Sequence, residues 1–293
     1  MKNKTITLTG NFRKNKFFPI ISKISDYFSK NENFKLLLSD DFLNDKSLKV
    51  SNSNIEIDSF ENCISQSDYV FSIGGDGTIL STIRKLEGKQ IPVLGIHIGN
   101  LGFLAMSTEE TLKKALNHFV ANEFEIKNKI LLKIHKESQP NKVFYSFNDV
   151  VIDHGNSGRV LKTIVSNKNE HINDYEGDGI IICTPTGSTA YSLSSGGPIV
   201  HSDLDVLTIT PISSHSLSAR PIVLPKDSLI KIEFSKSFVG ASLTIDGQIR
   251  KDLNINDKII VSKASICAKI IFMPYYSYVK TLKEKLHWSG NSR

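Results

Sequence analysis

The sequence contains few cysteines and no long apolar run, and both shortages exclude classes of protein. Three cysteines occur among 293 residues, at Cys63, Cys183 and Cys267. An odd number of widely spaced cysteines fits neither a CxxC metal site nor a disulfide framework, so we expect buried thiols. No apolar run approaches the ~18 residues that a membrane-spanning helix needs, and a strand-like pattern follows Met1–Thr5 where a secretory signal would be apolar. We therefore expect a soluble protein of the cytoplasm, without a membrane partner.

A strong excess of charge of one sign is also lacking. Lysine and arginine number 36 against 30 acidic residues, which gives a net charge of +6 and a pI near 9.0. The lysines are dispersed, and no RNA-binding signature occurs, so we expect anionic small molecules rather than nucleic acid as partners. Hydrophobic residues make up 40% of the chain and charged residues 23%, which is typical of a globular protein with room for two domains.

Strand and helix patterns alternate along the first part of the chain. The apolar spacings predict strands at Lys4–Thr9, Phe34–Leu38, Tyr69–Ile73 and Pro92–Ile96, and helices at Phe17–Phe28, Thr78–Leu86 and Thr108–Val120. Strands that alternate with helices form parallel sheets with helices on their faces. The sequence therefore predicts a Rossmann-like α/β nucleotide-binding domain over residues 1–122.

Short β-rich runs dominate after Ala121. Between Phe124 and Ile271 they are separated by Gly, Asn, Asp and Pro at intervals typical of an antiparallel sandwich. Helical spacing returns at Tyr278–Leu286. We therefore predict an all-β sandwich domain over residues 123–274, and a C-terminal helix over residues 275–293 that packs back on the first domain.

The strongest local signal is the motif Ser72-Ile-Gly-Gly-Asp-Gly-Thr78, which follows a predicted strand and precedes a helix. Its glycines let the backbone turn tightly and approach a ligand, and the amides of the helix start favour phosphates. Gly74, Gly75, Gly77 and Thr78 are therefore candidates for binding a phosphate. The motif is not a P-loop, because GxxxxGK[ST] is absent. A plain strand-to-helix turn is the alternative, but open α/β sheets bind ligands at this end of a parallel strand.

Three further segments carry polar groups in unusual places. Gly95–Leu104 follows the next strand and can wall the same crevice, although its His97 is a weak signal, since a lone His is usually structural. A buried GIIIC run ends in the hydroxyl-rich segment Thr184–Pro198, which is either a loop or a site for a sugar, a phosphate or an amide. Asn148 and Asp149 stand within an apolar run, where polar groups are costly unless satisfied, so the pair either caps a turn or meets a ligand.

Together these motifs resemble those of NAD kinases, which make NADP from NAD and ATP. The resemblance runs from Asp68 to Gln248, and the tail LKEKLHWSGNSR is similar to that of bacterial members. GGDGT alone is shared with diacylglycerol and sphingosine kinases. The motifs that make the resemblance specific are Gly95–Leu104, Asn148-Asp149 and especially Asp178-Gly with TPTGSTAYSLSSGGP, and Asp246-Gly-Gln248 completes the set.

The resemblance implies roles for the residues that match the family's motifs. Asp76 is the implied catalytic residue, which accepts the proton of the attacking ribose hydroxyl. The implied NAD-binding residues are Asp76, Gly77, Asn148, Asp149, Arg159, Asp178, Thr189, Ala190, Tyr191, Ser192, Leu193, Ser194 and Gln248. Two positions depart from the common pattern, because Asp149 stands where most members have Glu and His97 stands where Asn is common.

The implied reaction transfers the γ-phosphate of ATP to the 2′-hydroxyl of the adenosine ribose of NAD. A divalent cation, Mg²⁺, is expected on the phosphates, and no protein residue is predicted as a metal ligand. Members of the family are homodimers or homotetramers, in which a neighbouring subunit can contribute to the NAD site. The resemblance therefore implies a homo-oligomer.

Two other functions stay open on the sequence alone. A lipid kinase of the diacylglycerol type shares GGDGT but gives no reason for the TPTGSTAYS motif. A non-catalytic NAD-binding regulator would keep Asn148 and Asp178 but would need no carboxylate at position 76. A Rossmann dehydrogenase is disfavoured because GxGxxG is missing, and the HExxH, GxSxG and protein-kinase motifs are absent as well.

Overall fold

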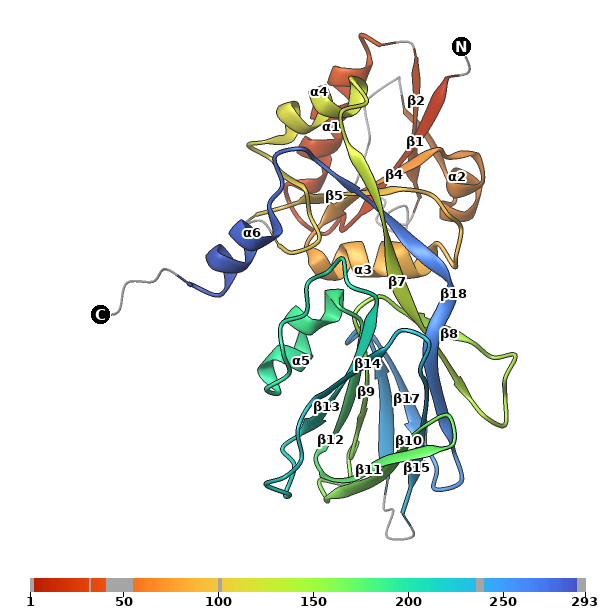
Figure 1. Ribbon diagram of the computed structural model, residues 1–293. Helices are drawn as coiled ribbons and strands as arrows, with labels where there is room; N and C mark the ends of the chain where they lie inside the picture. Colours follow the sequence, from red (N-terminus) through yellow and green to blue (C-terminus); the bar gives the residue numbers. More distant parts are fainter. Residues whose placement is uncertain (1–2, 32, 41–54, 100–101, 236–239, 289–293) are drawn as a thin grey trace. The chain divides into compact units, whose positions relative to one another are not determined.

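The computed structural model describes residues 3–31, 33–40, 55–99, 102–235 and 240–288. In this structure the chain forms two compact units (Figure 1). The first unit comprises residues 1–128 and 269–293, and the second comprises residues 129–268. Two strands, β7 (Glu125–Lys136) and β18 (Ile259–Phe272), continue from one unit into the other. Among the described helices, none is long and apolar enough to cross a membrane.

The first unit contains a parallel sheet. Its strands are β1 (Lys4–Gly10), β2 (Phe34–Ser39), β3 (Ile55–Asp58), β4 (Tyr69–Gly74), β5 (Val93–His97) and the short β6 (Ser107–Thr108). The order is β3-β2-β1-β4-β5, and the end of β18 lies parallel to β5 through Ile270 and Val93. The strand order reverses between β1 and β4, and open sheets of this kind bind ligands at such a switch point.

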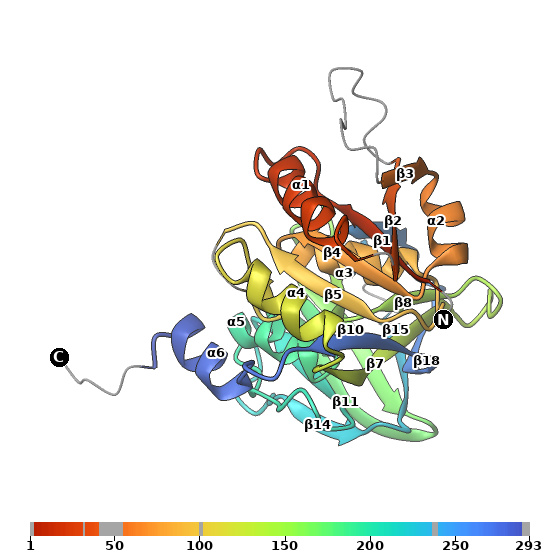
Figure 2. The ribbon, with the colours of Figure 1, turned by 90° about the horizontal axis from the view of Figure 1, so that it is seen from above.

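Helices cover both faces of this sheet (Figure 2). They are α1 (Phe17–Phe28), α2 (Phe60–Gln66), α3 (Asp76–Lys85) and α4 (Leu112–Val120). The last helix, α6 (Tyr278–Lys285), stands apart from the sheet in both views. Successive side chains of a strand point to opposite faces. Phe71 of β4 meets Phe28 of α1 and Phe119 of α4, with ring centroids 6.5 and 5.0 Å away. The next residue, Ser72, bonds Thr82 of α3 on the other face at 2.8 Å.

The second unit consists of two antiparallel sheets (Figure 1). One contains β11 (Glu170–Gly177), β10 (Leu161–Asn167), β15 (Leu229–Phe234) and β18 in that order. Strand β7 pairs with β18, and β8 (Phe144–Ser146) pairs with β7. The other contains β14 (Ile222–Pro225), β13 (Val206–Ile212), β12 (Gly179–Cys183), β9 (Asp149–Asp153), β16 (Ala241–Ile245) and β17 (Ile249–Leu253) in that order. A 3₁₀ helix, η1 (Thr186–Thr189), and the single turn α5 (Tyr191–Ser194) follow β12.

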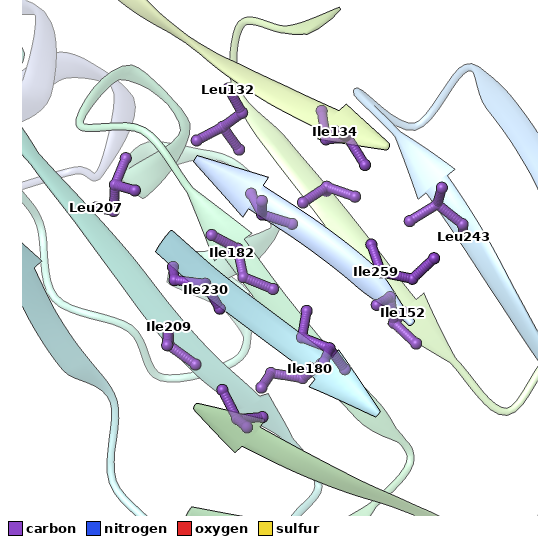
Figure 3. Packing of buried hydrophobic residues seen from close by; sticks show 14 of the residues in the cluster. Leu132, Ile134, Ile152, Ile180, Ile182, Leu207, Ile209, Ile230, Leu243 and Ile259 are labelled. Atoms are coloured by element: carbon purple, nitrogen blue, oxygen red, sulfur yellow. The ribbon is translucent and has the colours of Figure 1, made fainter. Parts of the chain in front are cut away.

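The core of the second unit lies between its two sheets (Figure 3). Alternate residues of β9 and β12 point into it, among them Ile152, Ile180 and Ile182, and all three are fully buried. Ile230 and Ile259 meet them from the opposite sheet. The intervening residues of β9 and β12, including Asp149 and Cys183, therefore face the outer side of their sheet.

The predicted fold class, an α/β part with a parallel sheet followed by a β-sandwich, is confirmed by this topology. Two helix starts differ from the prediction. Helix α3 begins at Asp76 rather than Thr78, because extended Gly75 serves as its N-cap. Helix α4 begins at Leu112 rather than Thr108, because the Thr111 hydroxyl accepts the Thr108 amide in a turn before the helix. The short β3 and α2 were not predicted.

Candidate active site

The GGDGT motif forms the turn between β4 and α3, next to the switch point of the sheet. The turn requires glycine at position 74, because a Cβ there would lie 2.4 Å from Thr78 Oγ1. Asp76 is the first residue of α3 and is partly exposed, whereas Gly77 is exposed. The positive end of the helix dipole lies at this turn and favours anions.

The loop after β5 holds the Asp76 side chain. The Phe103 amide donates to Asp76 Oδ2 at 2.8 Å, and the Leu104 amide donates to Oδ1 at 3.3 Å. A Cβ at Gly102 would lie only 2.1 Å from Asp76 Oδ1. The sequence predicted that this loop and the GGDGT turn wall one crevice, and the structure shows two direct bonds between them. Asn100 and Leu101 of the loop lie outside the described residues.

A segment that sequence reasoning missed lies at the same end of the sheet. Gly10 ends β1, and a Cβ on it would lie 1.9 Å from the Ile73 carbonyl oxygen. The next residue, Asn11, donates its amide to that oxygen at 2.9 Å. The signal available in the sequence was a glycine directly after the first strand. Gly10 and Asn11 therefore border the switch point beside the GGDGT turn.

His97 is also close to this turn. Its ring nitrogen Nε2 lies 3.6 Å from where a Cβ of Gly75 would be. The other nitrogen, Nδ1, is buried and has no hydrogen-bond partner among the described residues. A buried polar atom without a partner is costly, so this imidazole can hydrogen bond to a ligand or to water.

In the second unit, Asn148 and Asp149 lie where β9 begins. The Asn148 amide donates to Asp246 Oδ1 at 2.9 Å, and its carbonyl accepts the Thr184 amide at 2.9 Å. Its side-chain Oδ1 is buried and has no partner among the described residues. This orphan acceptor requires an N–H or O–H donor, which an amino group or a ribose hydroxyl of a nucleotide provides.

The carboxyl group of Asp149 is buried, with 4% of the residue exposed. Burial and the charge of Asp246 raise its pKa to about 7, although the Tyr191 amide opposes the shift by donating to it. The facing thiol of Cys183 is neutral, because burial raises its pKa to about 12. Asp149 therefore titrates near neutral pH in this structure.

The hydroxyl groups between Thr184 and Ser194 mostly bond inside the protein. Ser188 Oγ bonds the carbonyl and the amide of Val200, at 3.1 and 3.0 Å. Thr189 Oγ1 donates to the Thr186 carbonyl at 3.2 Å, and Ser192 Oγ pairs with Thr210 Oγ1 at 2.8 Å. These bonds shape the segment, and the Ser188 and Ser192 hydroxyls are fully buried. Their part in a ligand site stays a prediction, and any effect on a ligand would pass through the groups that they bond.

The rest of this segment remains accessible. Tyr191 is 47% exposed and Ser194 is exposed, whereas Thr189, Ala190 and Leu193 are half-buried. Gln248 is exposed in the turn between β16 and β17, where its amide donates to the Ile245 carbonyl at 2.9 Å. Since the neighbouring residue Asp246 bonds Asn148, the accessible positions Tyr191 and Gln248 lie around the Asn148-Asp149 pair.

Asp178 and Arg159 lie at the other end of these strands. Strand β12 pairs with β9 so that Cys183 is opposite Asp149 and Gly179 is opposite Asp153. At about 3.3 Å per residue, Asp178 is more than about 13 Å from Asp149 along the sheet. Asp178 is half-buried, and Arg159 is exposed in the turn after β9. The structure therefore divides the predicted NAD-binding residues of one chain between two ends of a sheet.

A resident metal site is not evident in the described part of the chain. No group of three or more His, Cys, Asp or Glu side chains there could hold an ion. The carboxylate of Asp76 stands without a second acidic partner in its turn, and Mg²⁺ commonly takes one or two carboxylates together with substrate phosphates. These residues fit a cation that arrives on a phosphate ligand.

Comparison with family models identifies the class of protein to which the chain belongs. Residues 21–124 match the family model of the ATP-NAD kinase N-terminal domain, and residues 147–273 match that of the ATP-NAD kinase C-terminal domain. The chain thus has the two domains of an ATP-dependent kinase. It is 37% identical to the NAD kinase of Nitrosomonas europaea over 243 residues, and this match covers 82% of each chain. It is 41% identical to the NAD kinase of Clostridium botulinum strain Loch Maree over 222 residues, and that match covers 75% of this chain and 79% of the relative. The chain belongs to the NAD kinase family.

Solved structures show the same fold. Yeast NADH kinase complexed with NADH matches with a TM-score of 0.90 at 24% identity, over 100% of this chain and 90% of that one. An NAD kinase from Archaeoglobus fulgidus in complex with ATP matches with a TM-score of 0.73 at 20% identity, over 97% and 98% of the two chains. Because both family models match, the lipid kinase and the non-catalytic regulator are not favoured.

Proposed function

We propose that this protein transfers the γ-phosphate of ATP to the 2′-hydroxyl of the adenosine ribose of NAD and so forms NADP. The single observation that supports the chemistry best is the Asp76 carboxylate, which two backbone amides hold at the N-terminus of α3. Membership of the NAD kinase family supplies the substrates. The relatives matched in sequence are NAD kinases, and the structural neighbours were solved with NADH and with ATP.

Asp76 acts as the general base in this proposal. Each carboxylate oxygen accepts one amide and keeps a second lone pair, so the group can accept the O–H of a ribose hydroxyl without leaving its place. Proton transfer to Asp76 as the P–O bond forms contributes about 10²–10⁴-fold to the rate. The two amides keep the carboxylate oriented, which is the requirement for such a transfer.

The glycine-rich turn binds ATP. Gly74, Gly75, Gly77 and Thr78 allow the phosphates to approach the backbone, and the α3 dipole favours their charge. Mg²⁺ enters on the phosphates as part of the substrate, and when bound it offsets the charge that develops during phosphoryl transfer.

NAD binds to the second unit. Asn148 offers its orphan Oδ1 to a donor, and Asp149 lies beside it as an acid that titrates near neutrality. The exposed ring of Tyr191 offers a face for stacking. Thr189, Ala190, Ser192, Leu193, Ser194 and Gln248 complete the proposed NAD set of this unit, with Ser192 acting through its bond to Thr210. In the first unit, Asp76 and Gly77 are the proposed NAD contacts.

Asp178 and Arg159 suggest that two copies of the chain share the NAD site. In one chain they lie at the end of β12 opposite to Asp149, too far for the same part of one ligand. A homodimer or homotetramer in which Asp178 and Arg159 serve the neighbouring subunit's site explains their position. ATP and NAD are small molecules of the cytoplasm, and we propose that location for the protein.

Product analysis after incubation of the protein with Mg-ATP and NAD tests the proposed function. Chromatography should show NADP and ADP in equal amounts. A lipid acceptor phosphorylated in place of NAD, or NAD binding without ATP consumption, would contradict the proposal.

A further inference from the structure

An aspartate at a hairpin tip is buried in this protein, although such positions are usually exposed. Asp246 follows β16 in the turn to β17, with φ of 48°, and Gly247 after it has φ of 64°. The Gln248 amide closes the turn on the Ile245 carbonyl. An Asp-Gly pair with two positive φ values is the usual sequence of a type I′ hairpin turn. Only 7% of Asp246 is exposed, and a buried carboxylate is costly unless it is well bonded.

Four donors surround this carboxylate, and all come from one short segment. Ser146 Oγ and the Asn148 amide donate to Oδ1 at 2.7 and 2.9 Å. The Asp149 amide lies 3.3 Å from the same oxygen, and the Phe147 amide donates to Oδ2 at 3.2 Å. In return, the Asp246 amide donates to the Asp149 carbonyl at 2.9 Å. Each residue from 146 to 149 thus donates a hydrogen bond to the Asp246 carboxylate.

The other side of the same segment is held by the turn after β12. Thr184 donates its amide to the Asn148 carbonyl at 2.9 Å and its hydroxyl to the Phe147 carbonyl at 2.6 Å. Gly187 packs against the segment so closely that a Cβ would lie 2.1 Å from the Asn148 oxygen. The backbone of Asn148 is therefore fixed from both sides, and only its side chain is left to meet a ligand.

We propose that Asp246 is a positioning residue for NAD, which orients the Asn148 and Asp149 side chains through their backbone amides without touching the ligand itself. The inference rests on the proposed function in one respect, namely that Asn148 and Asp149 bind NAD. Asp246 has a second effect on the pair, because its negative charge favours the protonated form of Asp149. The other groups that face Asp149 are the neutral Cys183 thiol on β12 and the Tyr191 amide on α5.

The experiment compares Asp246→Asn with Asp252→Asn in the full-length protein. Asp252 is an exposed carboxylate on β17 of the same hairpin, where it accepts a long bond from Ser242 Oγ at 3.5 Å, away from the Asp246-Gly247 turn. In Asp246→Asn, one carboxylate oxygen becomes an amide group that cannot accept, so part of the segment loses its partner. We expect the KM for NAD to rise at least about tenfold, by loss of charge-assisted bonds, while the KM for ATP changes less than about twofold. Asp252→Asn should match the wild type.

Two readouts separate positioning from a merely structural role. Amide hydrogen exchange should become at least about tenfold faster at Phe147, Asn148 and Asp149 in Asp246→Asn, since one position of the new side chain no longer accepts and its remaining oxygen has lost the negative charge. The inflection near neutral pH in the profile of KM for NAD should move to lower pH, because Asp149 loses a negative neighbour. Ser146→Ala removes one donor of four and keeps the Asp246 charge. It should produce smaller increases in amide exchange and in the KM for NAD without lowering the pH of the inflection, which keeps the test valid if Asp246→Asn does not fold.

Unchanged exchange and unchanged KM for NAD in a folded Asp246→Asn protein would overturn the inference and leave the proposed function standing. A wild-type protein that forms no NADP would instead overturn the proposed function. In that case the exchange measurement still decides whether Asp246 orders the segment, and calorimetric titration with NAD decides whether the ordered segment binds it.

Discussion

At the scale of single residues, Asp76 is the position where the charge of a side chain can best be changed without changing its size. Asp76→Asn keeps the size of the side chain, but the amide cannot take a proton near neutral pH. We expect kcat to fall at least a hundredfold, the low end of the contribution of a general base, with KM values for NAD and ATP changed little. Steady-state kinetics with both substrates measures the split.

Asp26→Asn provides a matched control for this prediction. Asp26 is an exposed carboxylate on α1 of the same unit, and its loss should leave the kinetics unchanged. Full turnover by a folded Asp76→Asn protein would show that Asp76 is only a turn residue.

Asp149 makes the stability of the fold depend on pH. Its carboxyl pKa is about 7 in the folded protein, because of burial and the charge of Asp246, against an ordinary value of 3.8. Between pH 4 and 7 the folded state therefore holds more protons than the unfolded chain, so the free energy of unfolding falls as pH rises through this range. The slope from this one group is at most about 1.4 kcal/mol per pH unit.

Asp149→Asn should remove that slope. We expect the variant to gain stability relative to the wild type at pH 8 and to gain little or nothing at pH 4, as measured by urea unfolding. Asp252→Asn, which removes an exposed carboxylate of the same unit, serves as the control. An equal effect of Asp149→Asn at both pH values would mean that Asp149 is ionised at little cost in the fold.

At the scale of elements, the fit between the β4–α3 turn and the loop after β5 can be tested at Gly102. A Cβ there would lie 2.1 Å from Asp76 Oδ1, so Gly102→Ala must displace either the loop or the carboxylate. We expect kcat to fall about tenfold or more, with a loss of stability of about 1–3 kcal/mol from overpacking.

Gly240→Ala is the comparison for Gly102→Ala. The nearest atom to a Cβ at Gly240 is Ser157 Cβ at 3.8 Å, an ordinary contact, so stability and activity should stay near the wild-type values. Equal behaviour of the two variants would mean that the loop moves without strain and that Asp76 does not depend on it.

The elements and their order were largely predictable from the sequence, whereas the contacts within the site were not. Apolar periodicity located α1 and most strands of the first sheet, because these elements bury one continuous face. The β3 strand and α2 escaped notice because they are too short for a period to show. Hydrogen-bond partners cannot be predicted from residue type, so the sequence did not show that the Ser188 hydroxyl bonds Val200 and that the Ser192 hydroxyl bonds Thr210 on β13.

Which motifs lie close together in the fold could not be predicted from the sequence either. The GIIIC strand between Asp178 and Thr184 was predicted, but only the register of β12 with β9 shows that Asp149 lies at its Thr184 end and far from Asp178. The role of Asp246 in holding four residues about a hundred positions away required the pairing of β16 with β9. The Asp246-Gly247 pair could be recognised in the sequence as a turn, but the hydrogen-bond partners of Asp246 could not.

At the scale of the whole molecule, sharing of the NAD site between subunits predicts complementation. Asp76→Asn and Asp178→Ala should each be nearly inactive alone. If Asp178 serves the neighbouring subunit, a mixed dimer contains one site with both residues intact and one with neither. Random mixing of equal amounts, after dissociation and reassembly, should then restore up to about a quarter of wild-type activity. No recovery in a verified mixed oligomer would place Asp178 in its own chain's site.

The path of the chain through the two units also bears on how the protein folds during synthesis. All of the second unit, residues 129–268, is made as one continuous stretch, whereas the first unit needs residues from both ends of the chain. The last strand of its parallel sheet arrives with β18, and Tyr275 then donates its hydroxyl to the Met106 carbonyl at 3.2 Å. Domains generally fold as they emerge from the ribosome. In topological terms the second unit is an insertion into the first, so it can be complete while the first still lacks its final strand. Premature termination beyond residue 268 would therefore leave a folded sandwich attached to an unfinished α/β sheet.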